Sequence, residues 1–129
     1  MRGTSSRTSF RILGDFDPDY ITSLLETAPT RVHRKGEKDK SGKPFERDGW
    51  FLSTGLPNAA SVEQQFLELT RLLLGKSEII KTLCKRYSVD VFCGITSEEQ
   101  GGFGLSTQAL RIFSEFGIGL EVSLILLDK

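Results

Sequence analysis

The sequence predicts an α+β protein, a two-layer sandwich in which a mixed five-stranded sheet carries four helices mainly on one face. Along the chain, segments in which apolar residues have helical spacing are interspersed with segments in which apolar and polar residues alternate. Near each end of the chain, an apolar strand leads through a polar or glycine-rich turn into a helix. The predicted order is β-α-β-β-α-α-β-α-β. We expect residues 1–129 to form a single domain, because a chain of this length can bury its own core.

The first strand is expected at residues 8–13, with Phe10 and Ile12 on one face. The helix that follows has strong start signals. Asp17 is suited to cap it, and Pro18 fits its first position because proline has no N–H to leave unpaired. Pro29 is expected to end this helix, since the residue before a proline is pushed out of the helical region.

A short, polar second strand is expected at residues 30–35, and its charges indicate a sheet edge or an exposed face. Residues 36–49 show no periodicity and contain glycine, proline and many charges. They predict a long surface loop, of the kind that is either functional or mobile. The third strand is expected at residues 50–54.

Ser61 and Gln64 form a capping-box pattern that opens a second helix. Its apolar stripe consists of Val62, Phe66, Leu69 and Leu73. Gly75 is expected to end this helix, and Ser77 to start a third helix.

The fourth strand is expected at residues 88–96, followed by a helix that Ser106 caps and Gly117 ends. The fifth strand, residues 118–127, is expected to bury Leu120, Val122, Leu124 and Leu126. The first and last helices are each long enough to connect parallel strands. The sheet face opposite the helices is expected to be partly open, because it would carry Arg11, Asp90, Glu121 and Ser123.

Composition excludes several classes of partner. The chain has 17 basic and 17 acidic residues, so no net field attracts nucleic acid or anionic lipid. We expect no nucleic-acid partner and no membrane segment, since no apolar run approaches the ~20 residues that a span needs. The N-terminal residues lack the apolar run of a signal peptide, which favours a cytoplasmic location. Cys84 and Cys93 fall on apolar faces and are interpreted as buried thiols.

Two motifs imitate ligand sites but have simpler explanations. Asp15, Asp17 and Asp19, with Glu26 further on, resemble a calcium loop, yet the glycine that such a loop needs is Tyr20. Helix capping explains these aspartates without a metal. The glycine-rich segment 101–104 lies before a helix, where phosphates often bind. Its neighbours Glu98 and Glu99 would repel an anion, so a connector is the preferred interpretation.

The remaining candidates form a possible binding surface on the strands that flank the long loop: Arg31, His33, Lys35, Glu37 and Trp50. Arginine and tryptophan are enriched where proteins recognise partners. The competing interpretation is that Trp50 belongs to the core and the charges form a hydrophilic edge. His33 is the only histidine, and no nucleophile or acid can be assigned to it as a partner.

Several short motifs resemble a bacterial family called domain of unknown function 4279. They are Phe10-x-Ile12-x-Gly14-x-x-x-Pro18, Ile21-Thr22, Pro29-Thr30, Lys35-Gly36-Glu37, Trp50 and Gly104-Leu-Ser106. The resemblance covers nearly the whole chain. It departs from the family pattern before Pro29, where Glu26 or Thr27 replaces the usual glycine. The resemblance implies a small, soluble bacterial α+β protein and supplies no activity, cofactor or catalytic residue.

The sequence therefore favours a non-enzymatic interaction domain with a protein partner, in its narrower form an immunity-type protein that blocks a toxin. We expect no catalytic set, no cofactor and no metal. The alternative is an enzyme or a binder of a small anionic ligand, with a pocket between the open sheet face and residues 36–49. Arg31 or Lys35 would then bind the anion, and Glu37 would act as a base.

Overall fold

The computed structural model describes residues 5–97 and 103–127 and confirms the α+β class and the order of elements. The strands are β1 Ser5–Gly14, β2 Arg31–His33, β3 Asp48–Ser53, β4 Ser88–Ser97 and β5 Gly119–Leu126. The helices are α1 Pro18–Leu25, α2 Val62–Leu72, α3 Ser77–Cys84 and α4 Thr107–Phe116. The glycine-rich segment around residue 101 lies outside the described residues.

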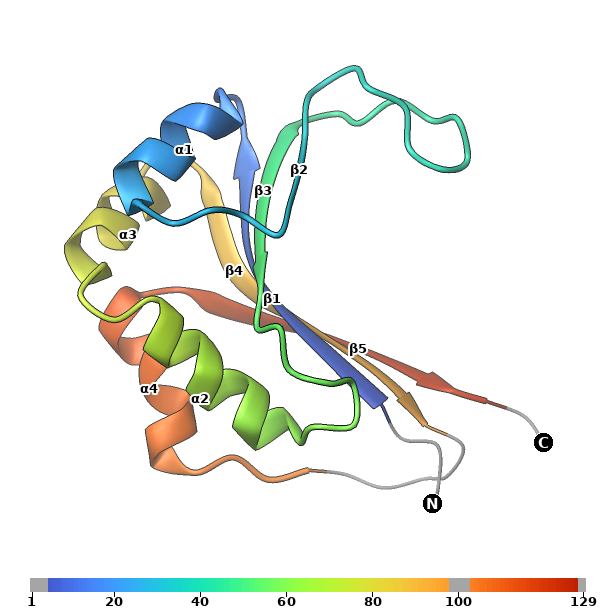
Figure 1. The fold of residues 1–129 in the computed structure, drawn as a ribbon, viewed down its shortest axis with the longest axis vertical. Helices are drawn as coiled ribbons and strands as arrows, with labels where there is room; N and C mark the ends of the chain where they lie inside the picture. The colour runs from blue at the N-terminus through green and yellow to red at the C-terminus, as the bar shows by residue number, and fades with distance from the viewer. Residues whose placement is uncertain (1–4, 98–102, 128–129) are drawn as a thin grey trace.

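The five strands form one sheet in the order β2-β3-β1-β4-β5 (Figure 1). The first strand, β1, lies in the middle and pairs antiparallel with both β3 and β4. β4 and β5 are parallel, as the length of α4 predicts. β1 and β2 also run in the same direction, but β3 lies between them and is antiparallel to each. β2 is an edge strand, in agreement with its polar sequence.

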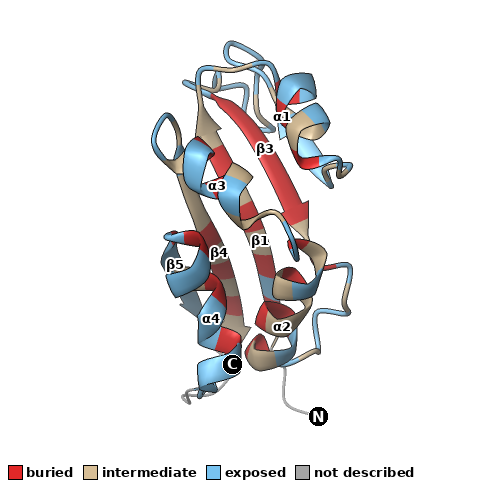
Figure 2. Ribbon diagram, turned by 90° about the vertical axis from the view of Figure 1, so that its left-hand side faces the viewer, coloured by how far each residue is buried: buried red, intermediate tan, exposed pale blue. Residues whose placement is uncertain are grey.

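All four helices lie on one side of the sheet (Figures 1 and 2). Buried stripes on the central strands face them, because alternate residues of a strand point to the same face. One apolar cluster fills this layer, and its largest fully buried side chains include Phe10, Ile12, Trp50, Phe66, Leu69 and Val91. Phe10 and Ile12, predicted to share one face of the first strand, are therefore both in the core.

Three of the predicted helix starts are confirmed by capping bonds, whereas α3 begins at Ser77 as predicted but has no side-chain cap. The Asp17 side chain accepts from the backbone N–H of Asp19, and Ser61 and Gln64 form the complete capping box. Ser106 accepts from the N–H of Ala109. The end of α1 was placed too late: Leu25 is its last residue, because Glu26 takes a left-handed conformation with φ of 51°.

The prediction for β5 is wrong in one respect. Its parallel pairing with β4 is as expected, but each of the four side chains predicted to be buried is at least 40% exposed. The reason is its place at the edge of the sheet, where α4 packs mainly on α2 and α3 and leaves the strand uncovered. The four residues are Leu120, Val122, Leu124 and Leu126.

No helix within the described ranges has the length and apolar character required to cross a membrane.

Candidate binding surface

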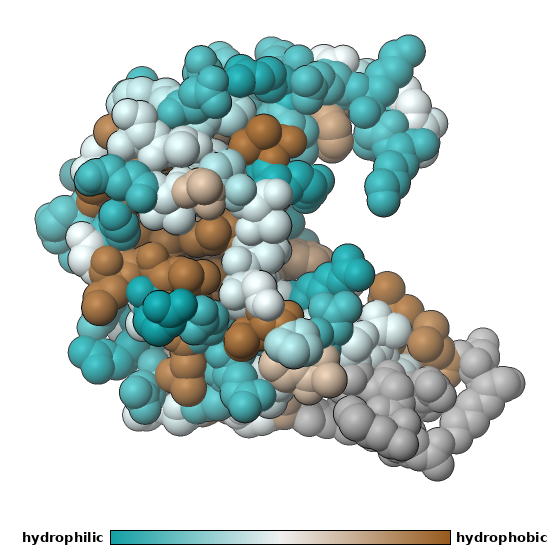
Figure 3. Space-filling view, viewed as in Figure 1, coloured by the Kyte–Doolittle hydropathy of each residue, from teal (hydrophilic) through white to brown (hydrophobic). Residues whose placement is uncertain are grey.

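The sheet face opposite the helices is curved inward, and we call it the concave face. The space-filling view shows the hollow on the right-hand side, below the overhang of residues 34–47 (Figure 3). Register places Arg31 beside Phe51, Phe51 beside Arg11, and Arg11 beside Asp90 on this face. One row of side chains thus crosses four strands.

Arg31 covers Phe51 from the solvent side. Its guanidinium carbon lies 4.0 Å from the centroid of the Phe51 ring, which is within the range of a cation–π contact. Phe51 is only 6% exposed, although no helix covers this face. Among the described residues, no carboxylate forms an ion pair with Arg31. Its donors are therefore held in place by the stack and remain available to a ligand.

Arg11, the other cation in this row, is already neutralised. Its guanidinium donates two hydrogen bonds to the Asp90 carboxylate, at 2.8 and 2.7 Å, and lies 3.4 Å from an oxygen of Glu121. The bond to Asp90 is the main reason why the pKa of Arg11 is raised. Arg11 also lies 4.9 Å from the centroid of Phe92. Three of the predicted outward residues, Arg11, Asp90 and Glu121, thus meet, and the charge of Arg11 is more than offset by the two acids.

His33 is packed between aromatic rings. Its ring lies parallel to that of Phe45, with centroids 3.7 Å apart, and Phe51 lies 5.2 Å away. A Cβ atom at Gly49 would lie 2.6 Å from two ring atoms of His33, so only glycine allows this position. Desolvation lowers the pKa of His33, and the charge of Arg31 lowers it further. His33 is therefore partly buried and favoured in its neutral form.

The segment between β2 and β3 is hydrogen-bonded along its length rather than irregular. Gly36 donates to the carbonyl of Phe45, Phe45 donates to that of Glu37, and Asp39 donates to that of Lys43. The Asp39 side chain accepts from three donors in the turn, which lowers its pKa. This segment, residues 34–47, is therefore a small hairpin, and we call it the overhanging hairpin.

Asp48 fastens the overhanging hairpin to the sheet. One carboxylate oxygen accepts from the N–H of Lys35 at 2.8 Å, and the other accepts from the N–H of Phe16 at 3.0 Å. The hydrogen bond from the Lys35 N–H lowers the pKa of Asp48 more than any other interaction does. In the sequence, Asp48 is one of many charges in residues 36–49. The signal that distinguishes it is its position at the start of an otherwise apolar strand, where its carboxylate can accept from backbone donors.

The candidate residues predicted from sequence do not form one site. Arg31 and His33 share the concave face, whereas Lys35 and Glu37 are exposed at the base of the hairpin. The Glu37 carboxylate accepts from the N–H of Arg34, so it stabilises a turn. Trp50 is fully buried on the helix side, where its indole N–H donates to Thr22 Oγ1 at 3.0 Å. Trp50 belongs to the core and does not contribute to the binding surface.

Two aspartates of the calcium-like motif, Asp17 and Asp19, are engaged in capping or ion pairing. Asp17 caps α1 and lies 3.1 Å from Arg34, and Asp19 lies 3.6 Å from the same guanidinium. Within the described parts of the chain, no three acidic, histidine or cysteine side chains are grouped to hold a metal. Cys93 is buried and Cys84 partly buried; both are free thiols, and burial raises the pKa of each.

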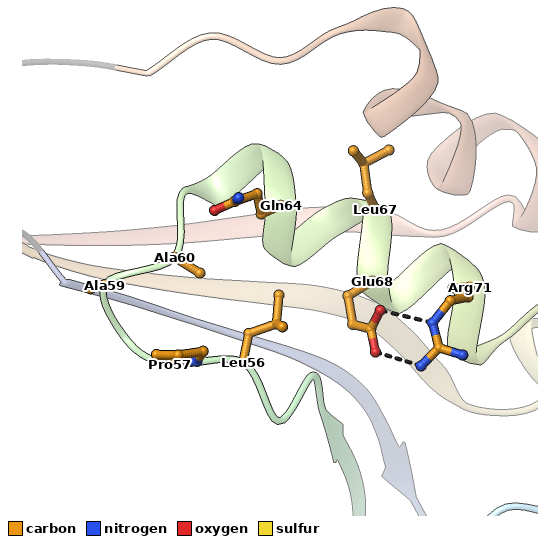
Figure 4. Close-up of a pocket in the computed structure, with 8 residues that line it drawn as sticks. All are labelled: Leu56, Pro57, Ala59, Ala60, Gln64, Leu67, Glu68 and Arg71. Atoms are coloured by element: carbon orange, nitrogen blue, oxygen red, sulfur yellow. Dashed lines mark hydrogen bonds and ion pairs between the residues drawn. The ribbon is translucent and has the colours of Figure 1, made fainter.

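A groove of about 670 Å³ lies away from the concave face, between α2 and the segment before it (Figure 4). Its walls are mainly apolar, and the ion pair between Glu68 and Arg71 closes one end. This groove does not correspond to the pocket that we predicted under residues 36–49. It is lined by Leu56, Pro57, Ala59, Ala60, Gln64, Leu67, Glu68 and Arg71.

The family model described as Domain of unknown function (DUF4279) matches residues 4–127. The chain belongs to DUF4279. No curated protein and no solved structure matches it. The resemblance that the sequence motifs indicated is therefore confirmed, and DUF4279 membership brings no activity with it.

Proposed function

We propose that this DUF4279 domain is a non-enzymatic interaction domain and that its concave face binds an acidic segment of a partner protein. The observation that supports this most directly is Arg31, whose guanidinium is fixed over Phe51 with no acidic partner among the described residues. Arginine held on an aromatic ring loses little freedom when it binds a carboxylate, so it is suited to recognition.

The overhanging hairpin adds positive charge above the hollow. It contains six basic residues and three acidic residues, an excess of three positive charges. Two of the three acids, Glu37 and Asp39, are bonded to donors of their own hairpin. The chain as a whole is neutral, so this local excess would attract an acidic surface without attracting anions generally.

The catalytic alternative has less support. Glu37, the residue proposed as a base, holds a turn and is exposed to solvent. The groove that the structure shows is apolar and lies elsewhere. A small anion bound by Arg31 remains the second candidate, because the same fixed guanidinium would serve it. Inhibition of a toxin is the narrower form of the interaction proposal, and a cytoplasmic location belongs to the same proposal.

The test is affinity capture from the native host with three baits: the unchanged chain, Arg31→Glu, and Arg86→Glu. Arg86 is a matched control, because it is also exposed and lies 5.6 Å from an aromatic ring, that of Tyr87. We expect one protein to be captured in a stoichiometric amount and lost only with Arg31→Glu. Capture should weaken as salt rises, since the contacts are between charges.

Equal capture by all three baits, or no capture above background, would contradict the proposal. Calorimetric titration with free dicarboxylates and inorganic phosphate tests the second candidate. Binding of either anion that depends on Arg31, without protein capture, would favour a small ligand over a protein partner.

A further inference from the structure

The outer edge of β5 is unprotected. Among the described residues, the strand pairs only with β4 and has no neighbour on its other side. It is eight residues long, contains no proline, and its only charge is Glu121. Edge strands of monomeric proteins are usually short, charged, interrupted by proline or covered, because their free backbone groups attract another strand.

The opposite edge of the sheet shows the usual protection. β2 has only three residues, two of which are Arg31 and His33, and it leads directly into the charged overhanging hairpin. The two edges of the sheet therefore differ, because β2 is short and polar whereas β5 is long and mainly apolar. Apolar side chains on and just after β5 are between 40% and 57% exposed: Leu120, Val122, Leu124, Ile125, Leu126 and Leu127.

We propose that two copies of this chain pair through β5, antiparallel and around a two-fold axis, to form a continuous ten-stranded sheet. A second copy fits because the strand is self-complementary. With Val122 on the axis, Leu120 of one copy opposes Leu124 of the other, and every side chain keeps its own face.

The charges agree with this register. Glu121 opposes Ser123 of the other copy rather than the other Glu121, so no two acids face each other across the pair. Each Glu121 is also 3.4 Å from Arg11 of its own chain. In this register residues 119–125 of one strand oppose residues 125–119 of the other, so seven of the eight residues of β5 pair.

The apolar area that this pairing could bury is in the range expected of a weak dimer. Fully burying a leucine-sized side chain removes on the order of 100 Å² of apolar surface. Six side chains that are about half exposed would then bury at most about 300 Å² per copy and about 600 Å² in the dimer, because edge-to-edge pairing leaves the faces of the sheet open. At about 60% apolar, the whole interface would be at most about 1,000 Å², the lower limit for a specific association. We therefore expect a weak dimer, with dissociation in the micromolar range.

Analytical ultracentrifugation of the full chain tests this proposal across nanomolar to several-hundred-micromolar concentrations. We expect a monomer–dimer equilibrium and no larger species, because the pairing consumes the free edge. Val122→Lys should shift the equilibrium at least tenfold toward monomer. Leu74→Lys is the control: Leu74 is 75% exposed and lies between α2 and α3, far from β5 in sequence and outside the sheet.

A cysteine in place of Val122 gives a second, independent readout. Opposed residues of antiparallel strands have Cα atoms about 4.5–5.5 Å apart, which is within the range of a disulfide. Mild oxidation should therefore link Val122→Cys chains in pairs, and should not link Leu74→Cys chains above the background of the unchanged protein.

A chain that stays monomeric at several hundred micromolar overturns the proposal, as does a dimer that Val122→Lys leaves intact. Open-ended oligomers would also overturn it. Stoichiometric capture of a different protein that competes with Val122→Cys cross-linking would show that the edge binds a foreign strand instead of a second copy.

Discussion

At the scale of single residues, Gly49 allows His33 and Phe51 to pack closely on the concave face. It is the glycine of β3, and its missing side chain leaves the space that the His33 ring occupies. His33 is recognisable as a candidate from the sequence, but its neighbours are not. Those neighbours come from β3 and from the overhanging hairpin, and only the folded pairing brings them together.

Gly49→Ala is expected to destabilise the protein by about 1–3 kcal/mol, because the new methyl group would overlap both His33 and Phe51. Urea denaturation measures this loss. Gly104→Ala is the matched control, since a Cβ there meets no atom within 4 Å. The loss should be smaller in a His33→Ala background. A loss of the same size in both backgrounds would mean that His33 is not the group displaced.

The stability of the protein should rise as the pH increases toward about 6.5, the ordinary pKa of histidine. Burial favours neutral His33, so its pKa in the folded state is below that of the unfolded chain. The folded state then binds fewer protons in this range, and stability is fully present above about pH 6.5 and falls as the imidazole is protonated. Because His33 is the only histidine, His33→Gln should flatten this part of the curve. Thermal melts at several pH values would show the change; a slope that persists in the variant would contradict the prediction.

At the scale of elements, the sequence predicts where a helix begins, but it does not predict which elements pack against each other. The starts of α1, α2 and α4 follow from Asp17, Ser61 and Ser106, because a cap depends on residues within one turn. The burial of β5 is not predictable in the same way. Its alternating apolar residues indicate a covered strand, but the cover depends on where α4 packs, which the pattern of β5 does not contain.

Ser106 connects two helices as well as capping one. Its N–H and hydroxyl both donate to the carboxylate of Glu63 in the first turn of α2, at 2.9 and 2.6 Å. Ser106→Ala should therefore cost about 1–2 kcal/mol, near the upper part of the usual range for a cap. Ser61→Ala is the matched comparison, since that cap is bonded within its own helix. Glu63→Gln should weaken the effect of Ser106→Ala; additive losses in the double variant would argue against this connection.

At the scale of the whole molecule, the order of the strands in the sheet could not be predicted from the sequence. Periodicity gives the number and type of elements, and crossover lengths give the relative directions of β4 and β5. The central position of β1 depends on contacts such as that of Arg11 with Asp90, which are 79 residues apart. Neither the sequence around Arg11 nor the sequence around Asp90 specifies the other residue as its partner. The concave face could therefore be predicted only as a partly open face with some of its charges.

The two proposals combine at this scale. A two-fold pairing through β5 would extend the sheet sideways and leave both concave faces on the same side of it. Two acidic segments of one partner, or of a dimeric partner, could then be bound together, and the second contact would gain from a raised effective concentration.

The central place of β1 also has a consequence for synthesis. The strand emerges from the ribosome first, yet β3 and β4, which flank it, end at residues 53 and 97. At a translation rate of about 5–20 residues per second, β1 waits several seconds for its second neighbour. Phe10 and Ile12 must stay out of aggregates during that interval, so the nascent chain is most vulnerable before translation reaches β4.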